Sequence, residues 1–461
     1  MKLPWPILSV AEMRVAEAAI FASGVEEYAL MQRAGRAAAQ LIWRAGGMRP
    51  TLVLCGPGNN GGDGYVIARA LADKGVPVRL AASADPVTSS AKQARVDWGG
   101  PVEDIMTAQG AMQIVDALFG IGLTRGLDEA LAGRLTELAR MAERTYAVDV
   151  PSGVASDSGA LLSAVPCFDL CIALGALKPA HVLRPAAMRF RQLICCDIGV
   201  DRAAARCFRL PKPRLMAPAD DAHKYTRGMV AVVAGEMPGA AALSAQAAAP
   251  GGAGYVKLFG AQAIVDLPHA IVRASLRDEA ARADPRIGAL LIGPGLGRDE
   301  KAMAKFTHVA DVRFPTVIDA DGLYIIEKTG FSILPEKAVL TPHAGEFARL
   351  FPDIMGTAIE QAQAAATRSG AVVVLKGPTS VIAAPDGRTM VADRASRWLS
   401  TAGTGDVLAG LCASRLAVTG DPFQAACEAV WLQGEAARLA GPAFIADDLI
   451  GHIPLALAAC L

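Results

Sequence analysis

The sequence lacks the features that would direct the chain to nucleic acid or to a membrane. Its 45 lysines and arginines are matched by 45 aspartates and glutamates, so no net electrostatic field attracts a nucleic acid or an acidic lipid surface. No apolar run is long enough to span a bilayer, because charged residues interrupt the alanine-rich stretches. We therefore expect a protein that recognises small molecules locally and has neither nucleic-acid nor membrane partners.

A disulfide framework and a signal peptide are also missing. The nine cysteines are an odd number without regular spacing, which is typical of a protein kept in a reducing compartment. The N-terminal segment holds too short an apolar run and too early a carboxylate for a secretory signal, which favours the cytoplasm. Cys195 and Cys196 are expected to be buried in a strand, since no cluster of histidines and cysteines surrounds them to form a metal site.

The composition is that of a compact α/β protein. The chain has 461 residues, 52% of them hydrophobic, and is longer than one hydrophobic core supports. Its length therefore predicts two or three domains. Short apolar runs alternate with helical periodicity, which predicts a three-layer domain with a mostly parallel sheet and a second α/β domain after it. Residues 200–220 carry three prolines and no steady period, so we predict a linker or a short domain-joining segment there, and domains at 1–205 and 215–461. The predicted strands are Leu52–Cys55, Val76–Ala81, Ile114–Leu118, Tyr146–Val150, Leu170–Leu174 and Gln192–Ile198, then Met229–Ala234, Tyr255–Phe259, Ala289–Ile292, Thr316–Ile318, Ala338–Leu340 and Val372–Leu375.

The first half is organised around a glycine-rich turn within Leu52–Leu71. A helix is predicted to leave this turn near Gly62, so backbone N–H groups and the helix dipole favour a phosphate or diphosphate there. Asn59, Asn60 and Asp63 are unusual in a hydride-transfer turn and suit a cation or a sugar hydroxyl. The glycines are expected to permit positive φ and close approach to a ligand, and they stand at positions 56, 58, 61, 62 and 64.

Two aspartates follow predicted strands downstream of that turn. Asp116 and Asp149 each begin where an apolar strand ends, at the edge of a parallel sheet that carries ligands, so both are expected to face the same crevice as Asn60. The alternative is that each caps the helix that follows it. A dehydrogenase is the rival function, because residues 56–61 match G-x-G-x-x-G. The only carboxylate at the ribose-binding spacing is Asp85, which lies in a polar turn.

Three segments of the first half resemble the signatures of the NAD(P)H-hydrate epimerases: GPGNNGGDG, DALFGIGLTRG and VDVPSGVASDSG. The likeness implies a Rossmann-like domain in which Asp149 is the catalytic acid or base. It also implies that a potassium ion is bound by Asn60, Asp116 and Ser152. Moving a proton at a hydroxyl-bearing carbon suits a positioned carboxylate, and the cation would offset phosphate charge. The implied cradle for the substrate's diphosphate and ribose consists of Asn59, Asn60, Gly61, Gly62, Asp63, Gly120, Ile121, Gly122, Leu123, Thr124, Arg125 and Gly126.

The sharpest motif of the second half is Ser400–Gly410, STAGTGDVLAG. Thr404 and Gly405 place backbone N–H groups at a helix start, which is an anion hole, and Asp406 stands beside it as a base. This arrangement suits deprotonation of a hydroxyl that attacks a phosphoryl group or has received one. The alternative is an aspartate that only caps the helix.

Four further motifs each follow an apolar strand: GPGLG at 293–297, DADGL at 319–323, TPHAGE at 341–346 and LKGPTS at 375–380. Together they resemble the ribokinase-like, ADP/ATP-dependent NAD(P)H-hydrate dehydratases. The likeness implies that Asp406 is the catalytic base and that the hydrated cofactor is contacted by Ala240, Gly297 and His343. The implied nucleotide site consists of Lys376, Gly377, Pro378, Thr379, Ser380 and Gly405. Asp319 and Asp321 are either Mg²⁺ ligands, directly or through water, or structural; His343 is either a ligand or a buried, satisfied histidine.

The sequence thus predicts a two-domain repair enzyme for hydrated NADH and NADPH, using K⁺, Mg²⁺ and ADP or ATP as co-substrate. The first domain is expected to interconvert the R and S hydrates and the second to dehydrate the S hydrate. The rival is a ribokinase-like vitamin-precursor kinase whose first domain is a non-catalytic nucleotide-binding or scaffold module. We also expect a homo-oligomer. The sequence does not indicate whether ADP or ATP is the preferred co-substrate, or whether the hydrate of NADH or of NADPH is the preferred substrate.

Overall fold

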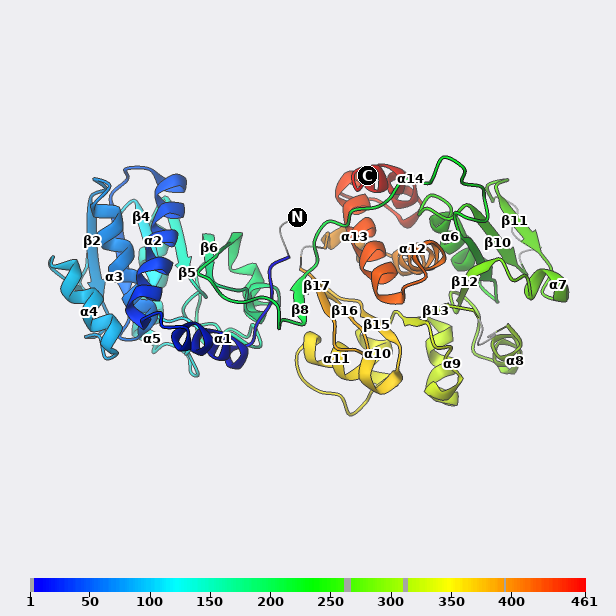
Figure 1. Ribbon diagram of the computed structural model, residues 1–461, viewed down its shortest axis with the longest axis horizontal. Coiled ribbons are helices and arrows are strands. Elements are labelled where there is room, and N and C mark those ends of the chain that lie inside the picture. The colour runs from blue at the N-terminus through cyan, green and yellow to red at the C-terminus, as the bar shows by residue number, and fades with distance from the viewer. Residues whose placement is uncertain (1–3, 261–266, 310–313, 394) are drawn as a thin grey trace. The chain divides into compact units, whose positions relative to one another are not determined.

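The computed structural model of the protein describes residues 4–260, 267–309, 314–393 and 395–461. The chain divides into two compact units, the first ending at Phe208 and the second beginning at Arg209 (Figure 1). This division falls between the domain limits expected from the sequence, which stay predictions. None of the helices in the described ranges is long and apolar enough to cross a membrane.

The first unit is built on a sheet whose described strands are all parallel, in the order β3-β2-β1-β4-β5-β6-β7. The strands are β1 (Thr51–Cys55), β2 (Val78–Ala82), β3 (Glu103–Asp104), β4 (Gln113–Ala117), β5 (Arg144–Val148), β6 (Phe168–Leu174) and β7 (Phe190–Cys196). The helices are α1 (Val10–Ala22), α2 (Glu27–Gly46), α3 (Asn59–Ala72), α4 (Ser89–Trp98) and α5 (Glu129–Met141), with short 3₁₀ turns η1 (Pro179–His181) and η2 (Ala186–Met188).

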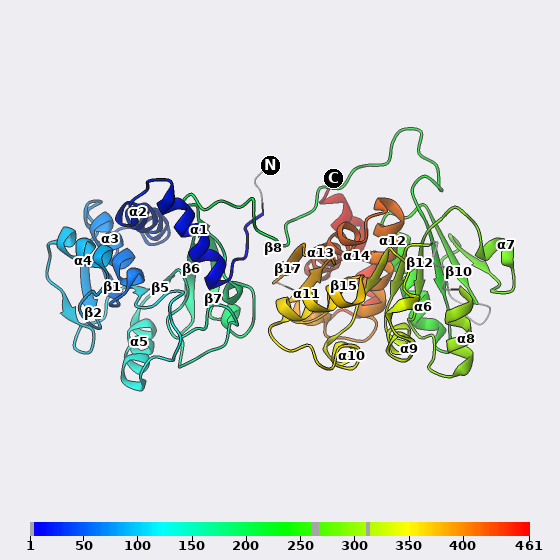
Figure 2. The same ribbon diagram turned by 60° about the horizontal axis from the view of Figure 1, so that its bottom comes forward.

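Helices cover both faces of this sheet, because successive side chains of a strand point to opposite faces. Val53 and Cys55 of β1 pack with α2 and α3, whereas Leu52 and Leu54 pack with α5. Every residue of β1 and β4 is buried, as expected for central parallel strands. Figure 2 shows α2 and α3 on one side of the strands and α5 on the other.

The second unit has a sheet of its own, in the order β11-β10-β9-β12-β13-β14-β15-β16-β17-β8. Neighbours from β11 to β15 are parallel, and β15, β16 and β17 pair antiparallel. The strands are β8 (Cys207–Arg209), β9 (Met229–Val233), β10 (Tyr255–Phe259), β11 (Ile271–Ala274), β12 (Ile287–Ile292), β13 (Thr316–Ile318), β14 (Ala338–Leu340), β15 (Val372–Leu375), β16 (Ser380–Ala383) and β17 (Thr389–Ala392). The helices are α6 (Pro238–Ala248), α7 (Glu279–Arg282), α8 (Glu300–Val309), α9 (Asp321–Thr329), α10 (Ala344–Leu350), α11 (Ala358–Ser369), α12 (Thr404–Thr419), α13 (Pro422–Ala440) and α14 (Ala446–Ala458), with 3₁₀ turns η3 (Phe331–Ile333) and η4 (Arg397–Leu399).

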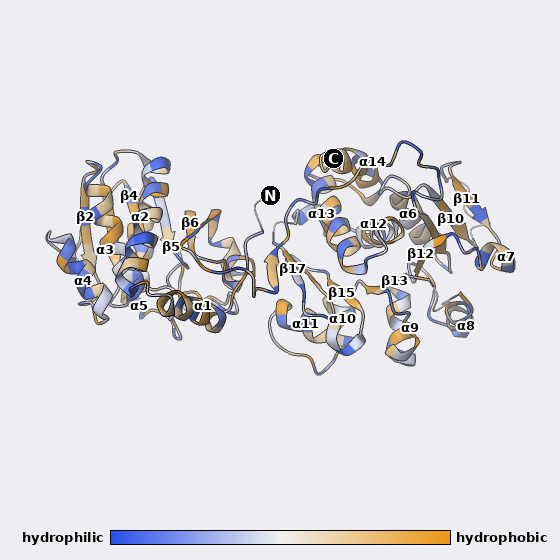
Figure 3. Ribbon diagram, viewed as in Figure 1, coloured by the Kyte–Doolittle hydropathy of each residue, from blue (hydrophilic) through white to orange (hydrophobic). Residues whose placement is uncertain are grey.

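Helix α12 is the central helix of the second core. Its residues from Val407 to Leu416 are buried, and it packs against α6 and α13. The approach to α6 requires Gly410, since a Cβ there would lie 2.1 Å from the carbonyl oxygen of Ser244. Figure 3 colours the chain by hydropathy and shows hydrophobic residues along strands such as β2 and hydrophilic ones on the outer helix α4.

The predicted fold class, two α/β domains with parallel sheets, is confirmed, and the predicted strands lie close to their expected bounds. Two local expectations are wrong. Helix α3 begins at Asn59 rather than near Gly62, and Cys195 is only half-buried because β7 ends the sheet order. The segment 200–220 contains the strand β8, which was not predicted, and the division between the two units. Strands β3, β11, β16 and β17 were not predicted, because they are short and carry no long apolar run.

Two candidate active sites

The glycine-rich turn leads from β1 into α3. None of its five glycines has positive φ, so that expectation is wrong. A Cβ at Gly56 would lie 1.8 Å from the carbonyl oxygen of Leu118, and a Cβ at Gly61 would lie 1.8 Å from that of Gly56. At Gly64 it would lie 2.6 Å from Sγ of Cys55. These glycines are therefore needed because the turn and α3 pack tightly against neighbouring strands and loops.

The two asparagines at the start of α3 have different surroundings. Asn59 is engaged by the protein: its Nδ2 donates to Oε1 of Glu27 at 2.8 Å, and its Oδ1 accepts from Oγ1 of Thr88 at 2.5 Å. Its side chain therefore holds neighbouring elements together, and its backbone is what remains for a ligand. Nδ2 of Asn60 is buried without a hydrogen-bond partner among the described residues. An acceptor oxygen of a bound substrate would satisfy it.

Asp149 follows β5 directly and has φ of 62°, left-handed backbone that a non-glycine residue seldom adopts. Its Oδ1 accepts from Nζ of Lys178 at 2.5 Å and from the backbone N–H of Leu174 at 3.4 Å, so it does not cap a following helix. Its Oδ2 lies beside Asn60: a Cβ built on Gly120 would be 3.2 Å from Oδ2 and 3.1 Å from Oδ1 of Asn60. The structure therefore brings the glycine loop, Asn60 and Asp149 together.

Asp116 and Ser152 form a buried pair at the end of β4. Oγ of Ser152 donates to Oδ1 of Asp116 at 2.7 Å, and the backbone N–H of Ser152 donates to Oδ2 at 2.9 Å. Burial raises the pKa of Asp116, and the hydrogen bonds from Ser152 and Leu118 oppose that rise. No basic side chain pairs with Asp116 in the described part of the chain, and no hydrogen bond there joins Asn60 to this pair.

Two more carboxylates lie near Asp149. Burial raises the pKa of Asp63 on α3 well above its ordinary value, and the charges of Asp149 and Glu17 raise it further. The pKa of Glu17 on α1 is raised as well, first by burial and then by Asp149. These raised pKa values show that the carboxylates repel one another and that burial favours their neutral forms, so an anionic diphosphate would bind there more readily beside a compensating cation.

The loop from Gly120 to Gly126, predicted as part of the cradle, starts inside the crevice and then turns outward. Gly120 borders Asn60 and Asp149, and Ile121 packs into the core. Gly122, Thr124 and Arg125 are exposed, whereas Leu123 is half-buried. A Cβ at Gly126 would lie 2.3 Å from the carbonyl oxygen of Leu162, so this glycine closes the loop against the protein. The exposed middle of the loop is free to meet a ligand.

The second site lies where α12 begins. Gly403 ends the preceding loop with φ of 85°, and Thr404 holds that loop by donating from Oγ1 to the carbonyl oxygens of Leu399 at 2.8 Å and Thr401 at 3.0 Å. Asp406 therefore stands in the first turn of a rigid helix, with free N–H groups beside it. Its side chain does not serve as the cap of α12, because Gly403 occupies that position.

Lys376 extends from the end of β15 toward the same place. Its Nζ donates to Oδ1 of Asp319 at 2.8 Å and lies 3.9 Å from Oε2 of Glu346. Burial lowers the pKa of Lys376, but the charges of Asp319 and Glu346 outweigh burial, so the pKa is raised and the ammonium stays protonated. A Cβ on Gly405 would lie 3.5 Å from this Nζ. The predicted lysine, glycine and aspartate therefore converge, although they are separate in sequence.

The electrostatics of Asp406 predict a pH dependence. Burial raises its pKa to about 7, with the charge of Asp319 adding to the rise and that of Lys376 opposing it. A carboxylate that acts as a base must be ionised, so a rate that depends on it increases as pH rises through about 7 and is lost below. We expect the nucleotide-dependent reaction of this unit, measured from about pH 6 to about pH 8, to increase with pH. A flat profile would contradict a role for Asp406 as base.

The residues predicted to contact the hydrated cofactor line the same edge. Gly297, with φ of 96°, follows β12, and Ala240 opens α6 beside Gly295. His343 is half-exposed and caps α10: its Nδ1 accepts from the N–H groups of Gly345 at 3.0 Å and Glu346 at 3.4 Å. His343 is thus not the buried histidine of the alternative, and its Nε2 lies 3.5 Å from Oε1 of Glu346. In the remaining predicted nucleotide segment, Gly377 and Pro378 are exposed, Thr379 is buried and Ser380 begins β16.

Asp319 and Asp321 are held by basic groups of the protein. Asp319 pairs with Lys376, and Oδ1 of Asp321 accepts from Nε of Arg298 at 2.7 Å. Oδ2 of Asp321 accepts from the N–H of Gly297 at 3.0 Å, so this aspartate fixes the glycine turn. Among the described residues no three acidic, histidine or cysteine side chains are grouped to hold a metal. Both aspartates therefore have structural partners in the protein, and whether they also bind Mg²⁺ stays a prediction.

Comparison with known proteins places both units. Residues 27–180 match a family model described as the YjeF-related protein N-terminus, and residues 230–452 match one described as NAD(P)H-hydrate dehydratase. A bifunctional NAD(P)H-hydrate repair enzyme of Salinibacter ruber is 35% identical over 97% of this chain and 95% of its own. The chain belongs to the bifunctional NAD(P)H-hydrate repair enzyme family.

Another member of this repair enzyme family, from Escherichia coli, is 32% identical over 93% of this chain and 89% of its own. A solved structure titled ADP/ATP-dependent NAD(P)H-hydrate dehydratase from Bacillus subtilis, co-crystallised with ATP and Mg²⁺, is 28% identical. It covers 54% of this chain and 95% of its own, with a TM-score of 0.48.

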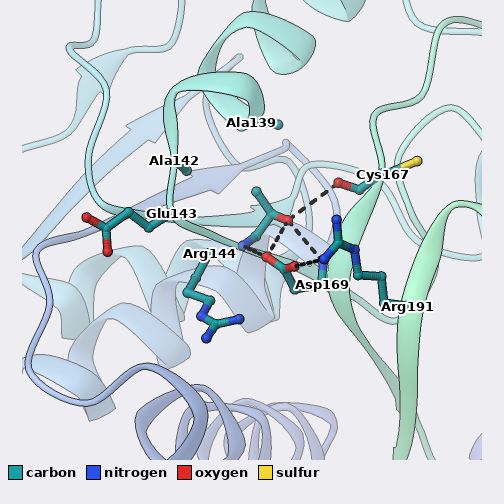
Figure 4. Close-up of a pocket in the computed structure, with 8 residues that line it drawn as sticks. Ala139, Ala142, Glu143, Arg144, Cys167, Asp169 and Arg191 are labelled. Atoms are coloured by element: carbon teal, nitrogen blue, oxygen red, sulfur yellow. Dashed lines mark hydrogen bonds and ion pairs between the residues drawn. The ribbon is translucent and has the colours of Figure 1, made fainter.

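One cavity of this repair enzyme lies away from both sites. Its volume is about 290 Å³, and it is lined at the opposite edge of the first sheet, where β5, β6 and β7 begin (Figure 4). Figure 4 shows Asp169 between Arg191 and the start of β5. Asp169 is already engaged, since its Oδ2 accepts from the N–H of Thr145 at 3.0 Å and from Oγ1 of Thr145 at 3.3 Å. This cavity contains none of the predicted site residues.

Three residues that lie near Asp149 in this repair enzyme were not predicted from the sequence: Lys178, His181 and Glu17. None belongs to a glycine motif. A signal was nevertheless present, because Lys178 and His181 stand in the otherwise apolar stretch IALGALKPAHVL, and a lysine inside such a stretch is buried only when it is paired. Glu17 had no comparable signal, since it lies in a helix distant in sequence.

Proposed function

We propose that this chain repairs hydrated NADH and NADPH in two steps. The first unit interconverts the R and S hydrates, and the second dehydrates the S hydrate with ADP or ATP as co-substrate. The observation that carries the proposal is the pair of separate carboxylate sites, one at Asp149 and one at Asp406, each at the C-terminal edge of the parallel strands of its own sheet. Membership of the repair enzyme family supports the same assignment.

In the first unit Asp149 moves the proton. Its Oδ2 faces the space beside Gly120, where the hydroxyl-bearing carbon of the nicotinamide ring would lie. Asn60 offers its unpartnered Nδ2 to an oxygen of the substrate. The backbone of the glycine turn and the exposed loop 122–125 hold the diphosphate and ribose, at the positive end of α3.

Potassium is the proposed ion of this site. Asn60, Asp116 and Ser152 supply only oxygen ligands, which suit a hard cation. Asp116 is buried without a basic partner among the described residues, and a cation would provide the missing positive charge. When bound, the ion offsets the charge of the substrate diphosphate. We expect KCl, but not an equal concentration of tetramethylammonium chloride, to raise both the epimerisation rate and the melting temperature of the protein; equal effects of the two salts would contradict the assignment.

In the second unit Asp406 takes the proton of the ring hydroxyl as that oxygen receives a phosphoryl group from the nucleotide. Phosphate then leaves the carbon that carried the hydroxyl and a proton leaves the neighbouring ring carbon, which forms the C=C bond and restores NAD(P)H. The N–H groups at the start of α12 and the ammonium of Lys376 stabilise the negative charge that develops on the transferred group. Magnesium would be bound by the nucleotide phosphates, and Asp319 and Asp321, which lie beside Lys376 and Arg298, are the carboxylates that could also bind it, directly or through water. Residues 376–380 hold the nucleotide.

The test is the reaction of the purified chain with the S hydrate, Mg²⁺ and either nucleotide. We expect one NAD(P)H regenerated and one free phosphate released for each nucleotide converted. The alternative, a vitamin-precursor kinase, predicts no regeneration and a stable phosphate ester with an alcohol such as hydroxymethylpyrimidine. Relatives that match along the whole chain argue against that alternative. The cytoplasmic location and the homo-oligomer stay predictions.

A further inference from the structure

Lys178 is among the most completely buried charged residues of the described chain, with a side chain 1% exposed. Its ammonium has three N–H groups and three acceptors: Oδ1 of Asp149 at 2.5 Å, the carbonyl oxygen of Leu174 at 2.8 Å and that of Ala176 at 3.2 Å. No N–H is left over for a substrate. The lysine is therefore directed at the protein rather than at a ligand.

His181 holds the backbone of the same aspartate. Its Nδ1 accepts from the backbone N–H of Lys178 at 2.8 Å, which places the ring proton on Nε2. Nε2 donates to the carbonyl oxygen of Asp149 at 2.6 Å. Burial, and then the charge of Lys178, lowers the pKa of His181 to about 4, so the ring is neutral. It joins the Lys178 backbone to the Asp149 backbone.

The remaining polar atoms of Asp149 are held by the same segment of chain. Its N–H donates to the carbonyl oxygen of Ile172 at 2.8 Å, and Sγ of Cys171 lies 3.5 Å from its carbonyl oxygen. These contacts keep the residue at φ of 62°, a conformation that costs energy and persists only when its surroundings fix it. Among the described residues no hydrogen bond reaches Oδ2, which is the atom that faces Gly120 and Asn60.

We infer that Lys178 is the positioning residue of the epimerisation site. Its ammonium holds Oδ1 of Asp149, and its backbone, through His181, holds the backbone of Asp149. Oδ2 is then the one carboxylate atom available to the substrate. This inference rests on the proposed epimerase function of the first unit. Lys178 does not touch the substrate and acts only through Asp149. Its removal should therefore slow the chemical step and leave substrate binding intact.

The test compares the full-length parent with Lys178→Met, using the R hydrate as substrate. We expect the epimerisation kcat to fall about 100-fold while KM stays within about threefold. Dehydration of the S hydrate by the second unit of the same molecule is the internal check, and it stays at the parental rate. Lys257→Met is the matched control, because it breaks another buried lysine–aspartate pair, with Asp284 at 3.5 Å, in the other unit. It leaves epimerisation unchanged.

A second variant separates positioning from general stability. In an Asp149→Asn background there is no acid or base left to position, so Lys178→Met should cause no further loss of kcat. Additive losses, or a Lys178→Met single variant whose kcat stays within threefold of the parent, would overturn the inference. If Lys178→Met does not fold, His181→Phe serves instead: it removes both ring contacts without removing a charge, and we expect a loss of about 10-fold or more in kcat. A parent chain that fails to epimerise would refute the proposed function instead.

Discussion

Asp406→Asn is expected to abolish nucleotide-dependent recovery of NAD(P)H and to leave epimerisation at the parental rate. Asparagine has the same shape but cannot accept a proton, and proton transfer by a positioned side chain contributes about 100-fold to 10,000-fold. Because Asp406 lies in the first turn of α12, beside Lys376 and the helix N–H groups, the substitution leaves the anion site in place. We expect a loss of at least about 1,000-fold in single-turnover dehydration of the S hydrate with ADP or with ATP.

The matched control is Asp421→Asn. Asp421 also stands at a helix start, where its Oδ1 accepts from the N–H groups of Phe423 at 2.8 Å and Gln424 at 3.0 Å. Asparagine serves equally well in such a cap, so this variant should keep full activity. Recovery by Asp406→Asn within threefold of the parent would show that the base is another residue.

The second large effect is expected for Asp149→Asn. With an epimeric mixture as substrate, this variant should recover only as much NAD(P)H as there was S hydrate at the start. The variant keeps the crevice but loses the acid or base at Oδ2. Removal of the carboxylate also leaves the buried ammonium of Lys178 without its partner, so the melting temperature should be lower as well. Chromatography of both epimers over time measures the stall directly.

Asp169→Asn is the control for this experiment, since Asp169 lies in the same unit at the opposite edge of the sheet. It should allow full recovery. Continued consumption of the R hydrate by Asp149→Asn, at a rate near that of the parent, would exclude Asp149 as the catalytic group.

The architecture could be predicted from the sequence because buried parallel strands are short, apolar and separated by amphipathic helices, as in β1 and β4. The positions of Asp149 and Asp406 followed from the same logic, since each stands directly after a strand or at the start of a helix. The strand β8 was hidden in a proline-rich segment, and the hairpin β16–β17 lacks a long apolar run.

What a side chain does within its surroundings was harder to predict. Asn59 was predicted to bind a ligand, but in the structure its carboxamide forms hydrogen bonds with Glu27 and Thr88. The glycines of the turn were expected to permit positive φ and close approach to a ligand, yet none of them has positive φ, and several are needed for close packing against Leu118 and other neighbours. Lys178 was missed because its role depends on a contact with Asp149, 29 residues earlier in the chain. Such contacts are set by the tertiary fold and leave no local motif.

The measurement that tests the whole account most directly follows the purified chain in two separate reactions, one begun with pure R hydrate and one with pure S hydrate. Each contains ADP, Mg²⁺ and K⁺, and the reduced-nicotinamide absorbance is recorded to completion. We expect full recovery of NAD(P)H from both, with a lag for the R hydrate while it is converted to S. Full recovery from the S hydrate alone, with the R hydrate unchanged, would contradict the claim that one chain carries both activities.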